Sequence, residues 1–235
     1  MDPTLPPEDP PRVTARHLRR TDSICALRLA KERAGKRGAH TPGSGFEVAN
    51  RITADARQAH AEMRVATPGD FPPPTDLMPE QQTVYAAASV WYVTLFGAVA
   101  ARAANVDEWS TVDESTGTLL SGPVGLVVEC ADGRAEVRSL ALGRNARPPD
   151  PASRAFTILR IAPWAGDRPV ELVWADLVAG RVETETVEAE RDLATARDLL
   201  ERCLDVIVER VADPRPQPGQ ECAYCRFVAE CGAHR

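Results

Sequence analysis

The chain is 235 residues long and carries 28 basic and 34 acidic side chains, which gives a net charge of −6. This length is enough for a domain with its own hydrophobic core, so a metal is not needed merely to replace missing apolar area. The acidic balance argues against a protein that coats nucleic acid, although it leaves room for a local basic groove.

The N-terminal part of the chain is predicted to be helical after a short leader. Residues 1–13 are rich in proline and poor in apolar side chains, which predicts a disordered leader. A helix is expected from Thr14 to about Arg37, and a loop at 35–45 follows it. A second helix is expected from Phe46 to Met63, and the apolar face of that helix consists of Val48, Ile52 and Ala56.

The next predicted helix runs from Pro79 to Asn105. Proline suits the first helical position, and Asp76 is expected to cap this helix. Residues 81–101 carry no charge and are long enough to cross a membrane. They are nevertheless rich in alanine, serine, threonine and glycine, which makes the segment only weakly hydrophobic. We therefore expect a buried core helix and no membrane partner.

The hydrophobic period then changes from helical to alternating. The predicted strands are Trp109–Ser115, Leu119–Cys130, Ala135–Leu142, Phe156–Ala162, Pro169–Leu177 and Arg181–Val187, with a tight turn at Asp132-Gly133. A final helix is expected from about Glu190 to Val211, because its apolar residues form one stripe. This order predicts an α/β or α+β domain over residues 14–211, followed by a cysteine-rich tail at 212–235.

Three cysteines gather in the tail: two residues separate Cys222 from Cys225, and five separate Cys225 from Cys231. This spacing predicts that three thiolates converge on one point. Zinc sites and iron–sulfur clusters take four ligands, and Cys25 is the best candidate for the fourth. Disulfides are disfavoured because the polar, proline-rich N-terminus does not resemble a signal peptide, which predicts a cytoplasmic protein.

We do not expect the remaining cysteines, or His17, His40 and His60, to bind a metal. Cys130 ends an apolar strand and Cys203 lies on the apolar stripe of the last helix, so both are expected to be small buried hydrophobic residues. His17, His40 and His60 are expected to be solvated rather than metal ligands.

One cysteine in an N-terminal helix, followed after a long gap by Cys-x2-Cys-x5-Cys, resembles the iron–sulfur members of the PD-(D/E)XK nuclease superfamily, in the RecB-like exonuclease group. The resemblance implies an α/β fold in which a central mixed sheet is flanked by helices, as in the restriction-endonuclease-like core. It also implies a [4Fe-4S] cluster that clasps the C-terminal cysteine loop to the N-terminal helix. The implied cluster ligands are Cys25, Cys222, Cys225 and Cys231. Zinc is the alternative metal, with Cys25 or His234 as its fourth ligand.

The catalytic residues of that family are missing from the matching stretches. The chemistry needs carboxylates on adjacent strands to bind Mg²⁺ and a lysine beside them. Gly125 and Ser139 stand at the positions of the acids, and Ala141 stands at the position of the lysine. No lysine follows Lys36, and arginine is a poor proton shuttle because its pKa is very high. The resemblance therefore predicts the fold and the clasp without the hydrolytic centre.

Two non-catalytic functions are expected from this pattern. Arginines in or after the former active-site strand would bind the phosphates of DNA or RNA. These arginines are Arg138, Arg144 and Arg147, followed by Arg154 and Arg160. The second function is a scaffold subunit that holds a protein partner in a larger complex.

Two alternatives stay open. One is an active Mg²⁺-dependent exonuclease with a displaced site. Its carboxylates would come from the group Asp113, Glu114, Glu129, Asp132 and Glu136, which otherwise predicts a solvated hairpin rim. The other is a zinc-stapled protein-interaction domain.

Overall fold

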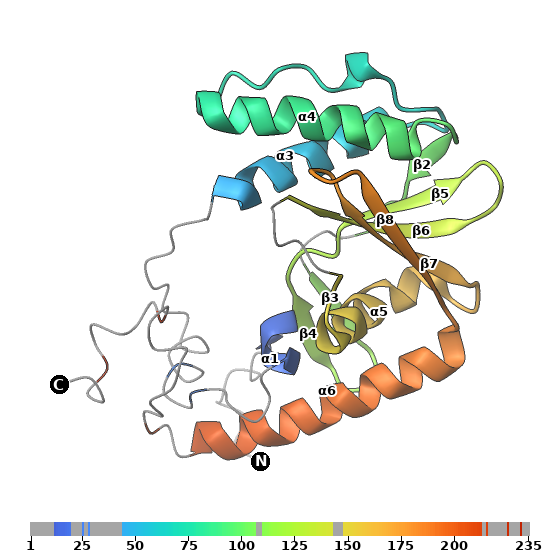
Figure 1. Ribbon diagram of the computed structural model, residues 1–235. Coiled ribbons are helices and arrows are strands. Elements are labelled where there is room, and N and C mark those ends of the chain that lie inside the picture. The colour runs from blue at the N-terminus through green and yellow to red at the C-terminus, as the bar shows by residue number, and fades with distance from the viewer. Residues whose placement is uncertain are drawn as a thin grey trace, which may run out of the picture.

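The computed structural model of this protein describes residues 12–19, 25, 28, 44–106, 110–142, 148–212, 215, 225 and 231. Within them, a five-stranded sheet lies between two layers of helices (Figure 1). The helices are α1 (Ala15–Arg19), α3 (Ser44–Ala59), α4 (Pro79–Phe96), α5 (Pro151–Ala165) and α6 (Ala189–Ala212), with a short 3-10 turn η2 (Pro68–Asp70). The fold class is α/β with mixed sheets flanked by helices.

The larger sheet has the strand order β2-β5-β6-β7-β8. Its strands are β2 (Ala101–Ala103), β5 (Leu126–Cys130), β6 (Ala135–Ala141), β7 (Val170–Asp176) and β8 (Arg181–Val187). β6 and β7 are parallel and the other neighbours are antiparallel, so the sheet is mixed. The connection from β6 to β7 contains α5, because parallel neighbours need a crossover and a helix is the usual one.

A three-stranded sheet has the order β1-β4-β3. Its strands are β1 (Arg12–Val13), β4 (Thr118–Ser121) and β3 (Ser110–Asp113). β1 runs parallel to β4, and Arg12 pairs with Leu119. Two residues that were expected in a disordered leader therefore form a strand, and Val13 is fully buried.

The two faces of the larger sheet pack against different helices. One face packs against α3 and α4, and the buried residues there include Val48, Ile52 and Ala56, as predicted for α3. The other face packs against α5, which in turn packs against α6. Figure 1 shows these layers on opposite sides of the strands. Because both faces are covered, alternate residues on a central strand are buried in either direction.

Several predicted elements are confirmed. β7 and β8 pair across the turn at Ala179-Gly180, and α6 buries Ala196, Leu200, Cys203 and Ile207 along one stripe. Gly133 has a φ of +91° in the turn between β5 and β6, which suits the predicted Asp-Gly hairpin.

The segment predicted as the strand Phe156–Ala162 is a helix instead. Asp150 caps α5, since its carboxylate accepts hydrogen bonds from the amides of Ala152 and Ser153, and Pro151 occupies the first helical position. The apolar residues that looked like a short strand are buried at helical spacing, as Ala152, Ala155, Phe156 and Leu159. The prediction was wrong because a short apolar run fits either period.

The predicted helix 79–105 is shorter than expected. It ends at Phe96, and residues 101–103 form β2 along the edge of the sheet. Pro79 begins the helix as predicted, but Asp76 does not cap it: Met78 holds the N-cap position, and Asp76 pairs with Arg51. The amide of Met78 instead donates to Oε1 of Gln81 at 2.9 Å. In the described part of the chain, no helix combines the length and the hydropathy needed to cross a bilayer.

The predicted strand Leu119–Cys130 is divided between the two sheets. Its first half is β4 in the small sheet and its second half is β5 in the large one. The break coincides with Gly122 and Gly125, which have φ values of +147° and +93°. Glycine is the residue that adopts such angles at low cost, so the bend follows from these two positions.

Candidate functional site

The strands β5 and β6 bring together the three positions at which the nuclease resemblance places catalytic residues. Leu126 pairs with Arg138, so the preceding residue, Gly125, lies opposite Ser139. A Cβ built at Gly125 would lie 3.6 Å from Oγ of Ser139. Ala141 is two residues beyond Ser139 and faces the same side of the sheet. A glycine, a serine and an alanine therefore occupy one small area.

A side chain at position 125 would force this backbone to shift. Its φ is +93°, and a Cβ at this position would lie only 2.7 Å from the carbonyl oxygen of Arg138. An aspartate at this position would have both the unfavourable angle and the clash. The packing therefore disfavours an acid at this position, where the sequence has glycine.

A hollow with a volume of about 140 Å³ lies next to Ser139, between α5 and strands β6 to β8. Ser139, Thr157 and Trp174 line it together with Glu183 and Glu185 of β8. Arg154 also lines it, but its guanidinium pairs with Glu185 at 2.8 Å and with Asp192 at 3.3 Å. The described charged residues that line this hollow are two carboxylates and one guanidinium group, and this set does not favour a phosphate chain.

Three neighbours of the candidate site, Trp174, Glu183 and Glu185, were not predicted from the sequence. Ser139 of β6 pairs with Trp174 of β7, and Trp174 pairs in turn with Glu183 of β8. The alternation Arg-Val-Glu-Thr-Glu-Thr from Arg181 to Thr186 shows that both glutamates share one face of β8. The sequence did not show that this face adjoins Ser139, because that depends on the strand order.

Arg138 is not on the surface, so it does not meet the expectation that it contacts nucleic acid. Only 1% of this residue is exposed. Its Nε donates to Glu136 at 2.8 Å, and its guanidinium carbon lies 4.3 Å from the centroid of the Phe96 ring. Arg160, also named for phosphate binding, is buried and donates to the carbonyls of Leu120 and Gly122. Arg144 and Arg147 lie outside the described residues.

Arg138 belongs to a buried polar network that joins β6 to α4 and to the end of α3. Its Nη1 donates to the hydroxyl of Tyr92 at 3.1 Å, and that hydroxyl lies 3.1 Å from Nε2 of His60. Nδ1 of His60 lies 3.2 Å from the carbonyl oxygen of Ala101 and 3.3 Å from that of Arg64. A neutral imidazole with its proton on Nδ1 satisfies all of these contacts.

The surroundings of this network favour the uncharged forms of His60 and Tyr92. Burial, followed by the charge of Arg138, lowers the pKa of His60 below its usual value. Burial raises the pKa of the Tyr92 hydroxyl. His60 and His17 are both buried, so the expectation that these histidines are solvated was wrong, and His40 lies outside the described residues. The sequence around His60 gave no indication that this residue is buried.

The acidic cluster around the strands is engaged in local pairs. Glu136 and Asp113 are buried, contrary to the predicted solvated rim. Glu136 also pairs with Arg134 at 2.7 Å, while Asp113 accepts hydrogen bonds from Ser115 and Thr116. Glu129 pairs with Arg102 and Arg168, and Asp132 pairs with Arg134. Glu114 is exposed.

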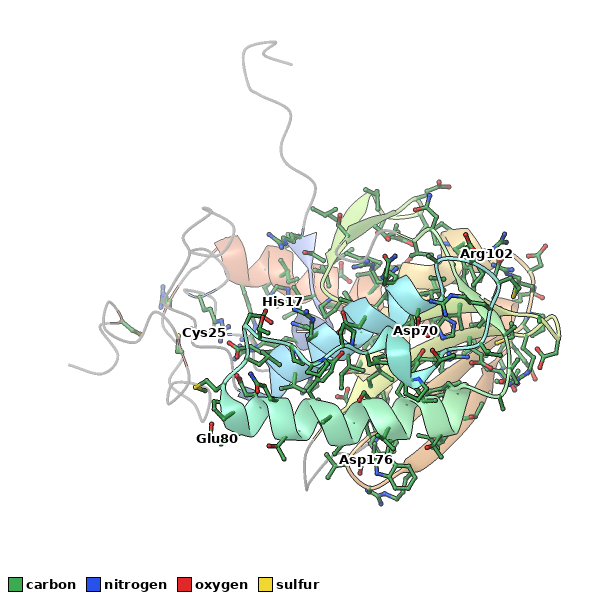
Figure 2. All side chains as sticks on the ribbon, turned by 90° about the horizontal axis from the view of Figure 1, so that it is seen from above. His17, Cys25, Asp70, Glu80, Arg102 and Asp176 are labelled. Atoms are coloured by element: carbon green, nitrogen blue, oxygen red, sulfur yellow. The ribbon has the colours of Figure 1, made fainter. Side chains whose placement is uncertain are left out.

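The described part of the chain contains no group of three or more His, Cys, Asp and Glu side chains placed to hold a metal ion. Three of the four predicted cluster ligands, Cys25, Cys225 and Cys231, are half-buried and not in disulfides with other described cysteines. In the view from above (Figure 2), Cys25 lies on the same side of the molecule as Glu80 and on the side opposite Arg102. Cys222 lies outside the described residues, so the four-thiolate set stays a prediction.

The two cysteines expected to be structural are confirmed as buried. Cys130 is 4% exposed and Cys203 is fully buried. Burial raises the pKa of the Cys130 thiol to about 11. Cys130 is therefore a protonated, unreactive thiol at neutral pH, because the thiolate is the reactive form.

Comparison with known proteins adds little to this geometry. No family model matches the chain, and no curated protein matches it. Among solved structures, one described as "Crystal structure of SSO0001" is 14% identical, and the match covers 98% of this chain and 90% of that chain with a TM-score of 0.43. A likeness of this size does not identify a function.

Proposed function

We propose that this protein is a non-hydrolytic, cytoplasmic scaffold subunit with a restriction-endonuclease-like core, which acts by holding a protein partner. The observation that carries the proposal is the row formed by Gly125, Ser139 and Ala141. The carboxylates and the lysine that phosphodiester hydrolysis would use are absent from these positions. Because a Cβ at position 125 would clash with the carbonyl oxygen of Arg138, moving side chains alone cannot make room for a metal-binding acid there.

A scaffold role is favoured over nucleic-acid binding by the state of the described arginines. Arg138 and Arg160 are buried, and Arg154 is paired with two carboxylates. The hollow beside Ser139 is bordered by Glu183 and Glu185. Nucleic-acid sites need cations free to meet phosphates, and these side chains do not provide them.

The scaffold is proposed to be closed by a [4Fe-4S] cluster on Cys25, Cys222, Cys225 and Cys231, with zinc as the alternative. The donor set is four thiols, the usual set for either metal centre. The two described thiols of the tail and Cys25 are half-buried rather than packed in the core like Cys130 and Cys203. The cluster, when bound, supplies a cross-link between the two ends of the chain.

Cleavage assays test the absence of hydrolysis. We expect no Mg²⁺- or Mn²⁺-dependent cleavage of single- or double-stranded DNA or RNA, because no metal-binding row is present on β5 and β6. Glu129→Gln and Asp132→Asn serve as matched variants for a displaced site. Cleavage by the wild type that either variant abolishes would overturn the proposal. Binding to DNA that weakens steeply with salt would replace the scaffold role by the nucleic-acid role.

Metal analysis tests the clasp. Protein purified without oxygen is expected to be brown and to contain about four irons per chain. Cys25→Ala and Cys222→Ala are expected to lose the iron, whereas Cys203→Ala, which alters a buried thiol of the core, is expected to keep it. A colourless protein with zinc and no iron would support the zinc alternative. Iron lost equally from all three variants would contradict the ligand assignment.

A further inference from the structure

The hollow beside Ser139 has a floor that three neighbouring strands supply in register. Ser139 of β6, Trp174 of β7 and Glu183 of β8 are paired in turn, so they form one row on the side of the sheet that faces α5. Adjacent strands lie about 4.8 Å apart, so the serine and the glutamate lie on opposite sides of the tryptophan. In the next row Leu172 of β7 pairs with Glu185 of β8. The floor is therefore aromatic and aliphatic, with carboxylates along the β8 side.

Trp174 is the buried polar residue of this floor. Only 6% of Trp174 is exposed, and its indole N–H donates to none of the described residues. This nitrogen is nevertheless not sealed inside the protein, and Trp174 lines the hollow. A buried donor without a partner is costly unless water or a ligand reaches it. The hollow is therefore a place that solvent or a bound molecule fills.

Glu183 is the charge in this hollow that the described residues leave unbalanced. It is exposed, lines the hollow and has no ionic partner in the part of the chain that the structure describes. Arg154, the cation of the lining, is already paired with two carboxylates. Arg181, two residues before Glu183, pairs with Asp176 at 2.9 Å. The charge left over is therefore negative, and a cation complements it.

The size and the walls of the hollow favour an organic cation over a metal ion. Its volume of about 140 Å³ is close to that of a cavity of about 150 Å³ that holds benzene. Nowhere among the described residues do three His, Cys, Asp or Glu side chains gather to bind a metal ion. Pro148, Pro149 and Leu172 provide apolar walls against which an alkyl stem would pack. A guanidinium group suits such a site because it is planar, stacks on an indole ring and presents several N–H donors to a carboxylate.

We propose that this hollow binds an alkylguanidinium group, whose head stacks on Trp174 and donates hydrogen bonds to Glu183 and to Oγ of Ser139. Its stem lies against Leu172 and the two prolines. The group belongs either to a free guanidine compound or to an arginine side chain of another protein, because both present the same head and stem. This binding goes beyond the scaffold role and requires neither the metal centre nor the nuclease resemblance.

The test titrates the full chain, with isotope-labelled tryptophans, with n-butylguanidinium chloride at constant ionic strength. The chain contains four tryptophans, and Trp174→Phe identifies the indole N–H signal of Trp174 in the NMR spectrum. That signal is expected to shift and to saturate, while the other indole signals keep their positions. n-Butylurea, which has a similar shape but no charge, is expected to leave it unchanged. No saturable shift, the same shift of every indole signal, or an equal response to n-butylurea would overturn the proposal.

Two variants test the role of the carboxylate. Glu183→Gln keeps the shape of the side chain and removes its charge. It is expected to weaken binding by about tenfold or more, the usual effect of losing a hydrogen bond to a charged group. Glu209→Gln is the matched control, because Glu209 is exposed on α6 and does not line the hollow. Its affinity is expected to equal that of the wild type. Wild-type affinity in a folded Glu183→Gln variant, as judged by circular dichroism, would contradict the assignment.

A capped tripeptide, acetyl-Gly-Arg-Gly-amide, separates the two sources of the guanidinium group. Tighter binding of the tripeptide than of n-butylguanidinium would assign the hollow to an arginine of another protein. Weaker binding would assign it to a free guanidine compound, and either result supports the guanidinium site. Since these titrations need no partner protein and no cluster, their failure is distinct from failure of the scaffold proposal.

Discussion

Replacing Arg138 by leucine is expected to lower the free energy of unfolding by about 3–5 kcal/mol, the usual cost of removing one partner from a buried ion pair. The substitution leaves the carboxylate of Glu136 buried, with Arg134 as its remaining ionic partner among the described residues. It also removes the donor to the Tyr92 hydroxyl and the guanidinium group over Phe96. Urea denaturation followed by circular dichroism measures the change.

Two further variants separate the ion pair from simple packing. Replacing both Glu136 and Arg138 by leucine is expected to recover most of the lost stability, because a well-packed apolar pair can replace a buried ion pair at little cost. Tyr92→Phe, which removes one hydroxyl and keeps the ring, is expected to cost about 1–3 kcal/mol. A double variant that is less stable than Arg138→Leu would contradict this account.

Replacing Gly125 by alanine is expected to lower the free energy of unfolding by about 3 kcal/mol. About 1–2 kcal/mol comes from the left-handed backbone angle. The rest comes from the clash between the new Cβ and the carbonyl oxygen of Arg138, since overpacking costs about 1–3 kcal/mol. Gly125→Asp is expected to be at least as unstable. Thermal and urea denaturation of the purified variants test both values.

Gly133→Ala is the control for the backbone angle alone. Gly133 has a φ of +91°, close to the +93° of Gly125, but no atom lies within 4 Å of a Cβ built there. Its alanine variant is therefore expected to lose only about 1–2 kcal/mol. Equal losses of unfolding free energy at the two glycines would mean that the Arg138 carbonyl group moves away from the new Cβ at little energetic cost. In that case position 125 would be open to an acid, and packing would no longer exclude a metal-binding carboxylate there.

The long amphipathic elements of this fold were predictable from their hydrophobic period. The apolar stripe of α6 and the face of α3 with Val48, Ile52 and Ala56 depend only on local spacing. The error at α5 was also local, because the signals Asp150 and Pro151 stood directly before the run that was assigned as a strand. A capping residue followed by proline should have outweighed a short apolar segment.

The candidate site was predictable in part. The Asp132-Gly133 turn predicts that β5 and β6 are neighbours, but it does not set the register. The structure shows that residues 131–133 form the loop, and this places Gly125 opposite Ser139. The burial of Arg138 could not be predicted from the sequence. Alternation along a strand assigns residues to two faces of the sheet, but it does not show that helices cover both faces. His60 was misjudged for the same reason, since its partners Tyr92 and Arg138 come from distant elements.

Because β1 pairs with β4, the three-stranded sheet cannot form until the ribosome has synthesised residues far along the chain from β1. Nη2 of Arg12 donates to Oγ of Ser121 at 2.6 Å, across 109 positions of the chain. Ribosomes add roughly 5–20 residues per second, so the first strand leaves the ribosome roughly 5–20 s before its partner exists. During this interval β1 has no partner strand, so the three-stranded sheet can form only after β4 has been synthesised.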